Sequence, residues 1–148
     1  MANTIGDWTT VTGDLSGNGV KHQCLITFDS SGAKQTTPPF NWAVMGDFTV
    51  IVTCFDDGVV ADADEQINMD INGSVTGIGV VGAAGNEWVE LDGKDSIVTD
   101  AGGGSHIGIH VYDFDSKGLM PHLNISLDPT NSTSSREYRI TVTPHHMV

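Results

Sequence analysis

The histidines offer the clearest metal chemistry in this sequence. His106 and His110 are four residues apart, a spacing that places two imidazoles on one face of a helix. Ile107 and Ile109 alternate with the residues between them as in a strand, where residues four apart are about 13 Å from each other. One metal ion cannot bridge His106 and His110 in the same strand. A metal ion could be shared only by two of His106, His110 and His122 if they lie on neighbouring strands. The sequence therefore predicts no metal site.

Acidic and amide side chains raise the question of a calcium loop. Asn68, Asp70 and Asn72 imitate its opening, but Gly79 stands where the bidentate Glu should be. Residues 56–65 hold a denser group of carboxylates that could bind a hard cation through oxygen. A solvated, self-repelling surface explains this group better, and no cation is predicted.

Nucleotide binding and nucleophilic catalysis also lack their structural context. Residues 77–82 match the Gly-x-Gly-x-x-Gly fingerprint, but a turn and a strand follow instead of the helix that receives the pyrophosphate. Ser105 lies beside a histidine, yet Ile107 replaces the last glycine of a nucleophile elbow. Cys24 and Cys54 lie in apolar stretches with no cation to favour thiolate, so we expect reduced thiols. We predict no catalytic residue, no cofactor and no enzyme.

Strand patterns position all of these residues. Polar and apolar side chains alternate over residues 20–28 and 42–54, the second run being broken at Gly46-Asp47. Residues 67–71 lead into Asn72-Gly73, a two-residue hairpin signal from which Val75 starts the return strand. Further strands are expected at residues 88–91, 97–99, 107–111, 123–127 and 138–142. The total is about nine.

The fold class predicted from this pattern is all-β, a two-sheet β-sandwich of immunoglobulin-like or jelly-roll type. Eighteen glycines leave little room for helix, and residues 59–66 form the only candidate helical turn. No composition shift marks a boundary, so residues 1–148 form one domain. The predicted core consists of Cys24, Ile26, Phe28, Val50, Val52, Ile107, Ile109, Leu123, Ile125, Ile140 and Val142.

The charge balance restricts the partners. Nineteen acidic residues against six Lys and Arg give a formal net charge of −13. Phosphate binding needs clustered cations, so nucleic acid and anionic membranes are not expected as partners. The chain opens Met1-Ala2-Asn3-Thr4 with neither a basic nor an apolar leader segment, which favours synthesis in a cytoplasm.

Two resemblances add to this picture. Residues 123–127, a turn rich in Asn, Ser and Thr, and residues 138–144 resemble the closing hairpin of immunoglobulin-like modules. The acidic, all-β chain without catalytic chemistry resembles the small capsid decoration or cement proteins of tailed bacteriophages. This resemblance implies a non-enzymatic virion protein, made in the host cytoplasm, that binds the outside of a protein lattice, reinforces subunit contacts and forms a homo-oligomer in the assembly.

Two alternatives to a decoration protein remain besides a metal-dependent enzyme, which would need a convergent cluster of His and carboxylate side chains. One is a carbohydrate-binding, lectin-like module, for which exposed aromatic platforms must come from Trp8, Trp42, Trp88, Tyr112 and Tyr138. The other is a different phage tail or adhesion component. An exposed apolar patch favours a protein lattice, whereas an exposed aromatic row beside acidic loops favours carbohydrate.

The N-terminal residues supply the candidate partner-binding site. Residues 1–19 are rich in Thr, Gly and Asn and contain one large anchor, Trp8, flanked by Ile5 and Val11. In one arrangement residues 5–11 pair as an extra strand and bury Trp8 in their own domain. In the other, residues 1–19 are an arm that adds a strand to a neighbouring subunit and buries Trp8 there.

Overall fold

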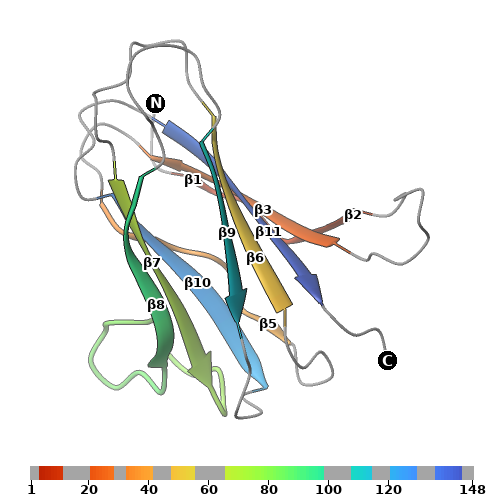
Figure 1. Ribbon diagram of the computed structural model, residues 1–148. Coiled ribbons are helices and arrows are strands. Elements are labelled where there is room, and N and C mark those ends of the chain that lie inside the picture. The colour runs from red at the N-terminus through yellow and green to blue at the C-terminus, as the bar shows by residue number, and fades with distance from the viewer. Residues whose placement is uncertain are drawn as a thin grey trace.

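The computed structural model describes residues 4–11, 21–28, 33–41, 48–55, 66–98, 108–114, 121–129 and 136–144 (Figure 1). In these ranges all the regular structure is β-strand, and the strands form two antiparallel sheets that face each other. The predicted all-β sandwich is therefore confirmed. The described residues include no helix able to span a membrane.

The first sheet follows the order β1-β3-β11-β6-β9, and β2 also pairs with β3. Its strands are β1 (Thr4–Ile5), β2 (Thr9–Val11), β3 (Lys21–Phe28), β6 (Phe48–Phe55), β9 (Gly108–Phe114) and β11 (Arg136–Pro144). The alternating runs noted in the sequence form its centre, where β11 lies between β3 and β6.

The second sheet follows the order β4-β10-β7-β8, and β5 also pairs with β10. Its strands are β4 (Gln35–Thr36), β5 (Phe40–Asn41), β7 (Gln66–Ser74), β8 (Val89–Val98) and β10 (His122–Pro129). From β3 onward the chain changes sheet at every connection except β4–β5 and β7–β8. That order of strands is the jelly-roll arrangement.

The core lies between the sheets and is built from alternate residues of the long strands. Eight predicted core residues are buried: Cys24, Ile26, Val50, Val52, Leu123, Ile125, Ile140 and Val142. Ile107 and the side chains of Phe28 and Ile109 lie outside the described part of the chain. Phe48, Ile67, Met69, Ile71, Leu127 and Tyr138 complete the cluster.

The predicted hairpin at Asn72-Gly73 is wrong. Strand β7 runs through both residues to Ser74, and they pair with β10 on one side and β8 on the other. The Asn72 amide donates to Asn124 Oδ1 and Ser126 Oγ at 2.9 and 3.0 Å, so its polar group is satisfied inside the sheet. The chain reverses later, in residues 75–88.

Two smaller expectations also change. Residues 88–91 and 97–99 were expected as separate strands, but β8 is continuous from Val89 to Val98 and accommodates its register shifts as bulges. In the segment expected as a helical turn, Gln66 begins β7, and residues 59–65 lie outside the described residues.

The N-terminal residues 4–11 pair within their own domain. Ile5 lies opposite Ile26 and Thr10 opposite His22, both through strands that border β3. Trp8 is partly buried against the core, and its Nε1 donates to the carbonyl oxygen of Pro38 at 2.7 Å. Trp8 therefore links the edge of the first sheet to the β4–β5 segment of the second.

We expect Trp8 to be important for stability. Trp8→Ala should lower the free energy of unfolding by about 3 kcal/mol, because it removes a large side chain packed on the core. Trp8→Phe keeps most of the ring and should cost about 1 kcal/mol for the lost hydrogen bond. Denaturant unfolding measures both, and equal stability of Trp8→Ala and the parent chain would contradict the internal packing.

Candidate functional site

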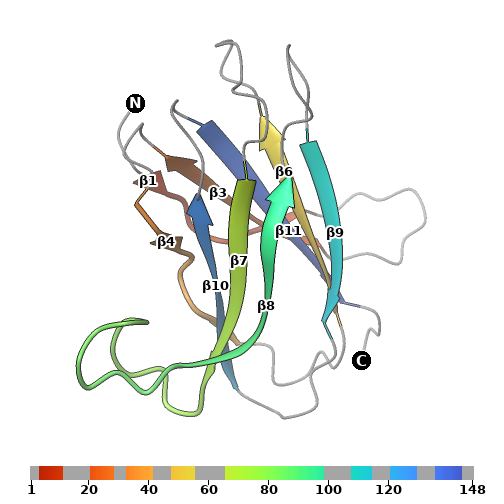
Figure 2. The same cartoon turned by 60° about the vertical axis from the view of Figure 1, so that its left-hand side comes forward.

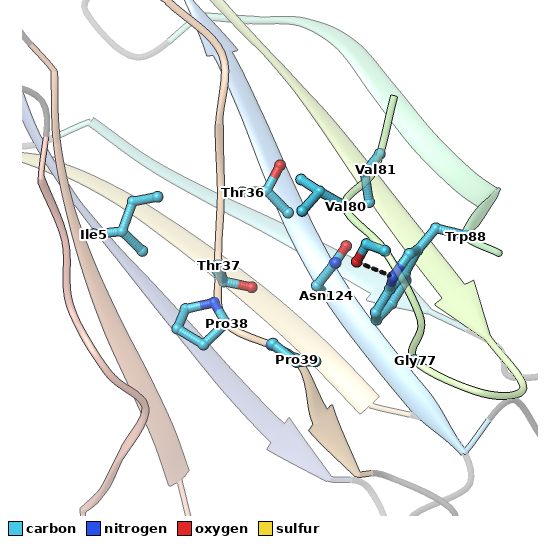
Figure 3. A pocket seen from close by; sticks show the side chains of 11 residues that line it. Ile5, Thr36, Thr37, Pro38, Pro39, Gly77, Val80, Val81, Trp88 and Asn124 are labelled. Carbon is cyan, nitrogen blue, oxygen red and sulfur yellow. Dashed lines mark hydrogen bonds between the residues drawn. The ribbon is translucent and has the colours of Figure 1, made fainter. Parts of the chain in front are cut away.

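A cleft opens where the N-terminal strand, the β4 segment and the β7–β8 loop approach one another (Figure 3). It consists of two adjoining hollows of about 340 and 350 Å³. Both are lined by Ile5, Thr36, Val80 and Val81. In Figure 3, Ile5 stands on one side of the β4 segment, and the two valines stand on the other. Together the hollows follow residues 34–39 along the chain.

The floor of the cleft is polar but internally satisfied. Thr36 Oγ1 lies 2.8 Å from Ser126 Oγ, and Ser126 Oγ accepts from the Asn72 amide. Asn124, which lines the cleft, accepts from the same amide. Thr37 Oγ1 accepts the backbone N–H of Ile125 at 3.0 Å. These groups bond chiefly to each other, so the floor is fixed before any ligand arrives.

Residues 75–88, which we call the apolar loop, form the wall of the cleft on the other side of the β4 segment from Ile5. Figure 2 shows this loop projecting beyond the ends of β7 and β8. No charged residue occurs from Val75 to Asn86. Val75 and Val80 are each 67% exposed and Ile78 is 59% exposed. Three aliphatic side chains thus face solvent on one loop, next to a cleft that already has apolar walls.

The apolar loop is held by its own hydrogen bonds. Trp88 Nε1 donates to the carbonyl oxygen of Gly79 at 3.1 Å, and the backbone N–H of Glu87 donates to Ile78 at 3.1 Å. Thr76 bonds to the carboxylate of Glu87 across the base of the loop. The glycines at 77, 79, 82 and 85 all have positive φ. The loop therefore has a defined shape that presents its aliphatic side chains outward.

The predicted partner-binding residues do not gather in one place. Ile5 is 42% exposed and lines the cleft. Trp8 points toward the core, and the side chain of Val11 in β2 lies outside the described part. A partner role for Ile5, Trp8 and Val11 stays a prediction. Ile78 and Val80 were not expected from the sequence to be exposed here, although the charge-free run of residues 75–86 is a signal that could have indicated it.

The dinucleotide-like glycines lie in this same loop. Gly77, Gly79 and Gly82 precede β8, a strand, so no helix N-terminus follows them, as the sequence predicted. Gly77 lies under the ring of His122: a Cβ there would be 3.2 Å from the imidazole Cγ. These glycines shape a turn and permit close packing.

A polar patch lies on the second sheet beside the cleft, since Lys34 lines one of the two hollows. Lys34 Nζ is 2.6 Å from Asp70 Oδ2. A Cβ at Gly93 would lie 3.2 Å from Asp70 Oδ1 and 3.3 Å from Glu90 Oε1, so the glycine lets the two carboxylates approach the same point. Within the described ranges no group of three His, Cys, Asp or Glu residues could hold a metal ion.

The described cysteine is poorly suited to nucleophilic chemistry. Cys24 is buried, and its Sγ donates to the carbonyl oxygen of Gly6 at 3.1 Å. Burial, and then the negative charge of Asp7, raise the pKa of the Cys24 thiol to about 11. At neutral pH the group is a protonated thiol rather than a nucleophilic thiolate.

Comparison with known proteins finds no matching family model and no matching curated protein. Among solved structures, the K1 cleaved adhesin domain of Lys-gingipain from Porphyromonas gingivalis W83 is 13% identical, with a TM-score of 0.44 over 99% of this chain and 100% of that one. The C-terminal CBM6 of LamC from Zobellia galactanivorans is 12% identical, with a TM-score of 0.42 over 95% and 90%. The mitogen from Yersinia pseudotuberculosis is 12% identical, with a TM-score of 0.37 over 99% and 91%. Similarity this low carries no information about what this chain binds.

The shape of the apolar loop should depend on Gly79 more than on Gly82. Both have φ near +80°, but a Cβ at Gly79 would lie 2.8 Å from the Cα of Asn86, whereas nothing lies within 4 Å of one at Gly82. Gly82→Ala should cost about 1 kcal/mol of backbone strain, and Gly79→Ala should cost clearly more. Thermal unfolding and Trp88 fluorescence measure the difference. Equal effects would show that the loop does not hold this close contact.

Proposed function

We propose that this chain is a non-catalytic module that attaches to the surface of a protein assembly through its apolar loop. The observation that supports this most is the exposure of Val75, Ile78 and Val80 on a loop held by internal hydrogen bonds. Apolar side chains grouped on a protein surface are typical of interaction sites. A surface that is ordered before binding loses less conformational entropy when a partner arrives.

A capsid lattice is the assembly that fits the remaining properties. The resemblance to decoration proteins implies attachment to the outside of a virion, with copies of the chain arranged by the lattice. A net charge of −13 keeps the free protein soluble and repels nucleic acid. The charge-free loop is a part of this acidic molecule that a protein surface can approach without desolvating carboxylates.

The test is rebinding to particles. Large particles recovered from the source of the protein by gradient centrifugation should contain this chain, and stripped particles should rebind the recombinant protein. Ile78→Ser should weaken rebinding about tenfold or more, since it removes an exposed aliphatic contact. Leu25→Ser is the matched control, because Leu25 is 44% exposed on β3, away from the loop. Absence from particles, or equal rebinding of both variants, would contradict the proposal.

Carbohydrate binding is the second candidate, and the polar patch favours it. The side chains of Lys34, Asp70 and Glu90 are charged, can form hydrogen bonds and lie close together on the second sheet. Stacking platforms are less evident: among the described side chains, Trp88 is 8% and Tyr138 0% exposed, and Trp8 is partly buried. Trp42 and the side chain of Tyr112 lie outside the described part.

A glycan array distinguishes the two candidates. If the polar patch binds sugar, the parent chain should bind particular immobilised oligosaccharides, and Asp70→Asn should reduce that binding at least about tenfold. Asp95→Asn, an exposed acid also on the second sheet, is the control and should bind as the parent does. Binding that Asp70→Asn leaves unchanged, or no binding to any oligosaccharide, would count against this candidate.

A further inference from the structure

Among the described strands, one edge of the second sheet is open beside the cleft. Strand β4 is the last strand of that sheet, with β10 on its inner side. The backbone N–H of Thr37 donates to Ile125, and Gln35 pairs with Leu127. Because alternate residues of an antiparallel strand direct their backbone groups to opposite sides, the N–H and C=O of Thr36 point away from β10.

The next carbonyl group that points outward from this edge already accepts a hydrogen bond. The carbonyl of Pro38, two residues further along, accepts from the indole of Trp8. In the described part of the chain β4 pairs with β10 alone, so no described strand pairs with the outward side of Thr36. These two groups therefore border the cleft as an unoccupied donor and acceptor in one strand position.

The shape and lining of the cleft match an extended chain. The two hollows meet at Thr36 and together follow residues 34–39, about 16 Å of extended backbone. Ile5 on one side, Val80 and Val81 on the other, offer apolar contacts to alternate side chains. Unpaired strand edges with such pockets bind peptides by adding a strand.

The charges define the occupant further. Among the described residues, Lys34 is the one charged residue lining the two hollows, and it is paired with Asp70. Two exposed acids lie next to the lining residues in the sequence: Asp7 is two residues after Ile5 on one wall, and Glu87 directly precedes Trp88 on the other. The centre of the occupant is therefore uncharged, and its flanks are basic. A second copy of this chain is a poor match because both would carry a charge of −13.

From these observations we infer that the cleft binds an extended peptide segment of the protein partner, with uncharged, alternately apolar residues between basic flanks, which adds as a strand to β4 at Thr36. This inference rests on the proposed function, since the segment belongs to the protein to which the module attaches. It adds a specific site: the apolar loop contacts the partner surface, and the β4 edge binds one of its strands.

The test uses linear random-sequence peptides displayed on phage and selected on the full chain. Enriched peptides should alternate apolar and uncharged residues between Lys or Arg. Thr36→Pro removes the outward N–H at an edge position that tolerates proline, and should weaken binding about tenfold. Thr36→Val also loses the Ser126 contact but keeps the N–H, so it should weaken binding much less than Thr36→Pro does.

A second measurement does not depend on folding of the proline variant. N-methylation of the peptide residue that pairs with Thr36 should weaken binding to the parent chain, whereas methylation one residue along, on the outward side, should not. Failure to enrich any peptide, or equal binding of both methylated peptides, would overturn the inference. Because particle rebinding is tested through Ile78, the docking proposal and this strand-addition site can fail separately.

Discussion

The register of β7 against β10 is the constraint on which the rest of the molecule depends. It sets Ile71 opposite Ile125 in the core and Asn72 opposite Asn124 on the outer face. A slip by one residue would exchange these faces, burying amides among aliphatic side chains. The Asn72–Asn124 hydrogen bond, at 2.9 Å, is made only in the native register. One pairing therefore fixes both the hydrophobic core and the floor of the cleft.

Near the β7–β8 connection of this sheet, the tryptophan is buried and aliphatic side chains are exposed. Trp88, which could have formed an exposed platform, is buried and bonds to the carbonyl of Gly79. Val75, Ile78 and Val80 are among the exposed side chains, and they lie on a turn that contains positive-φ glycines. The tryptophan thus stabilises the loop, and the short aliphatic residues, which have little rotamer entropy to lose, form its exposed surface.

The sequence allowed the sandwich and much of its core to be predicted because alternation is a local property. Ile26, Val52 and Ile140 follow directly from the period of two along their strands. The error at Asn72-Gly73 has the opposite cause. Asn-Gly favours a turn locally, but bonds to residues 52 and 54 positions away keep the strand extended. No local pattern contains that information.

The cleft could not be predicted from local patterns, because Ile5, Thr36 and Val80 are far apart in the sequence and come together only when both sheets have formed. The charge-free run of residues 75–86 is a local feature of the sequence, but its glycine spacing also matches a nucleotide-binding fingerprint, and exposure of Val75 and Val80 is set by the folded loop.

The Asn72–Asn124 pair also has a consequence for the cells in which this chain can fold. Asn72-Gly73-Ser74 and Asn124-Ile125-Ser126 are both acceptor sequences for N-linked sugar. In the sheet the two asparagines are 2% and 4% exposed, which leaves no space for a glycan. A sugar attached to either one before folding would separate β7 from β10. The native fold thus requires that both asparagine side chains reach it unmodified.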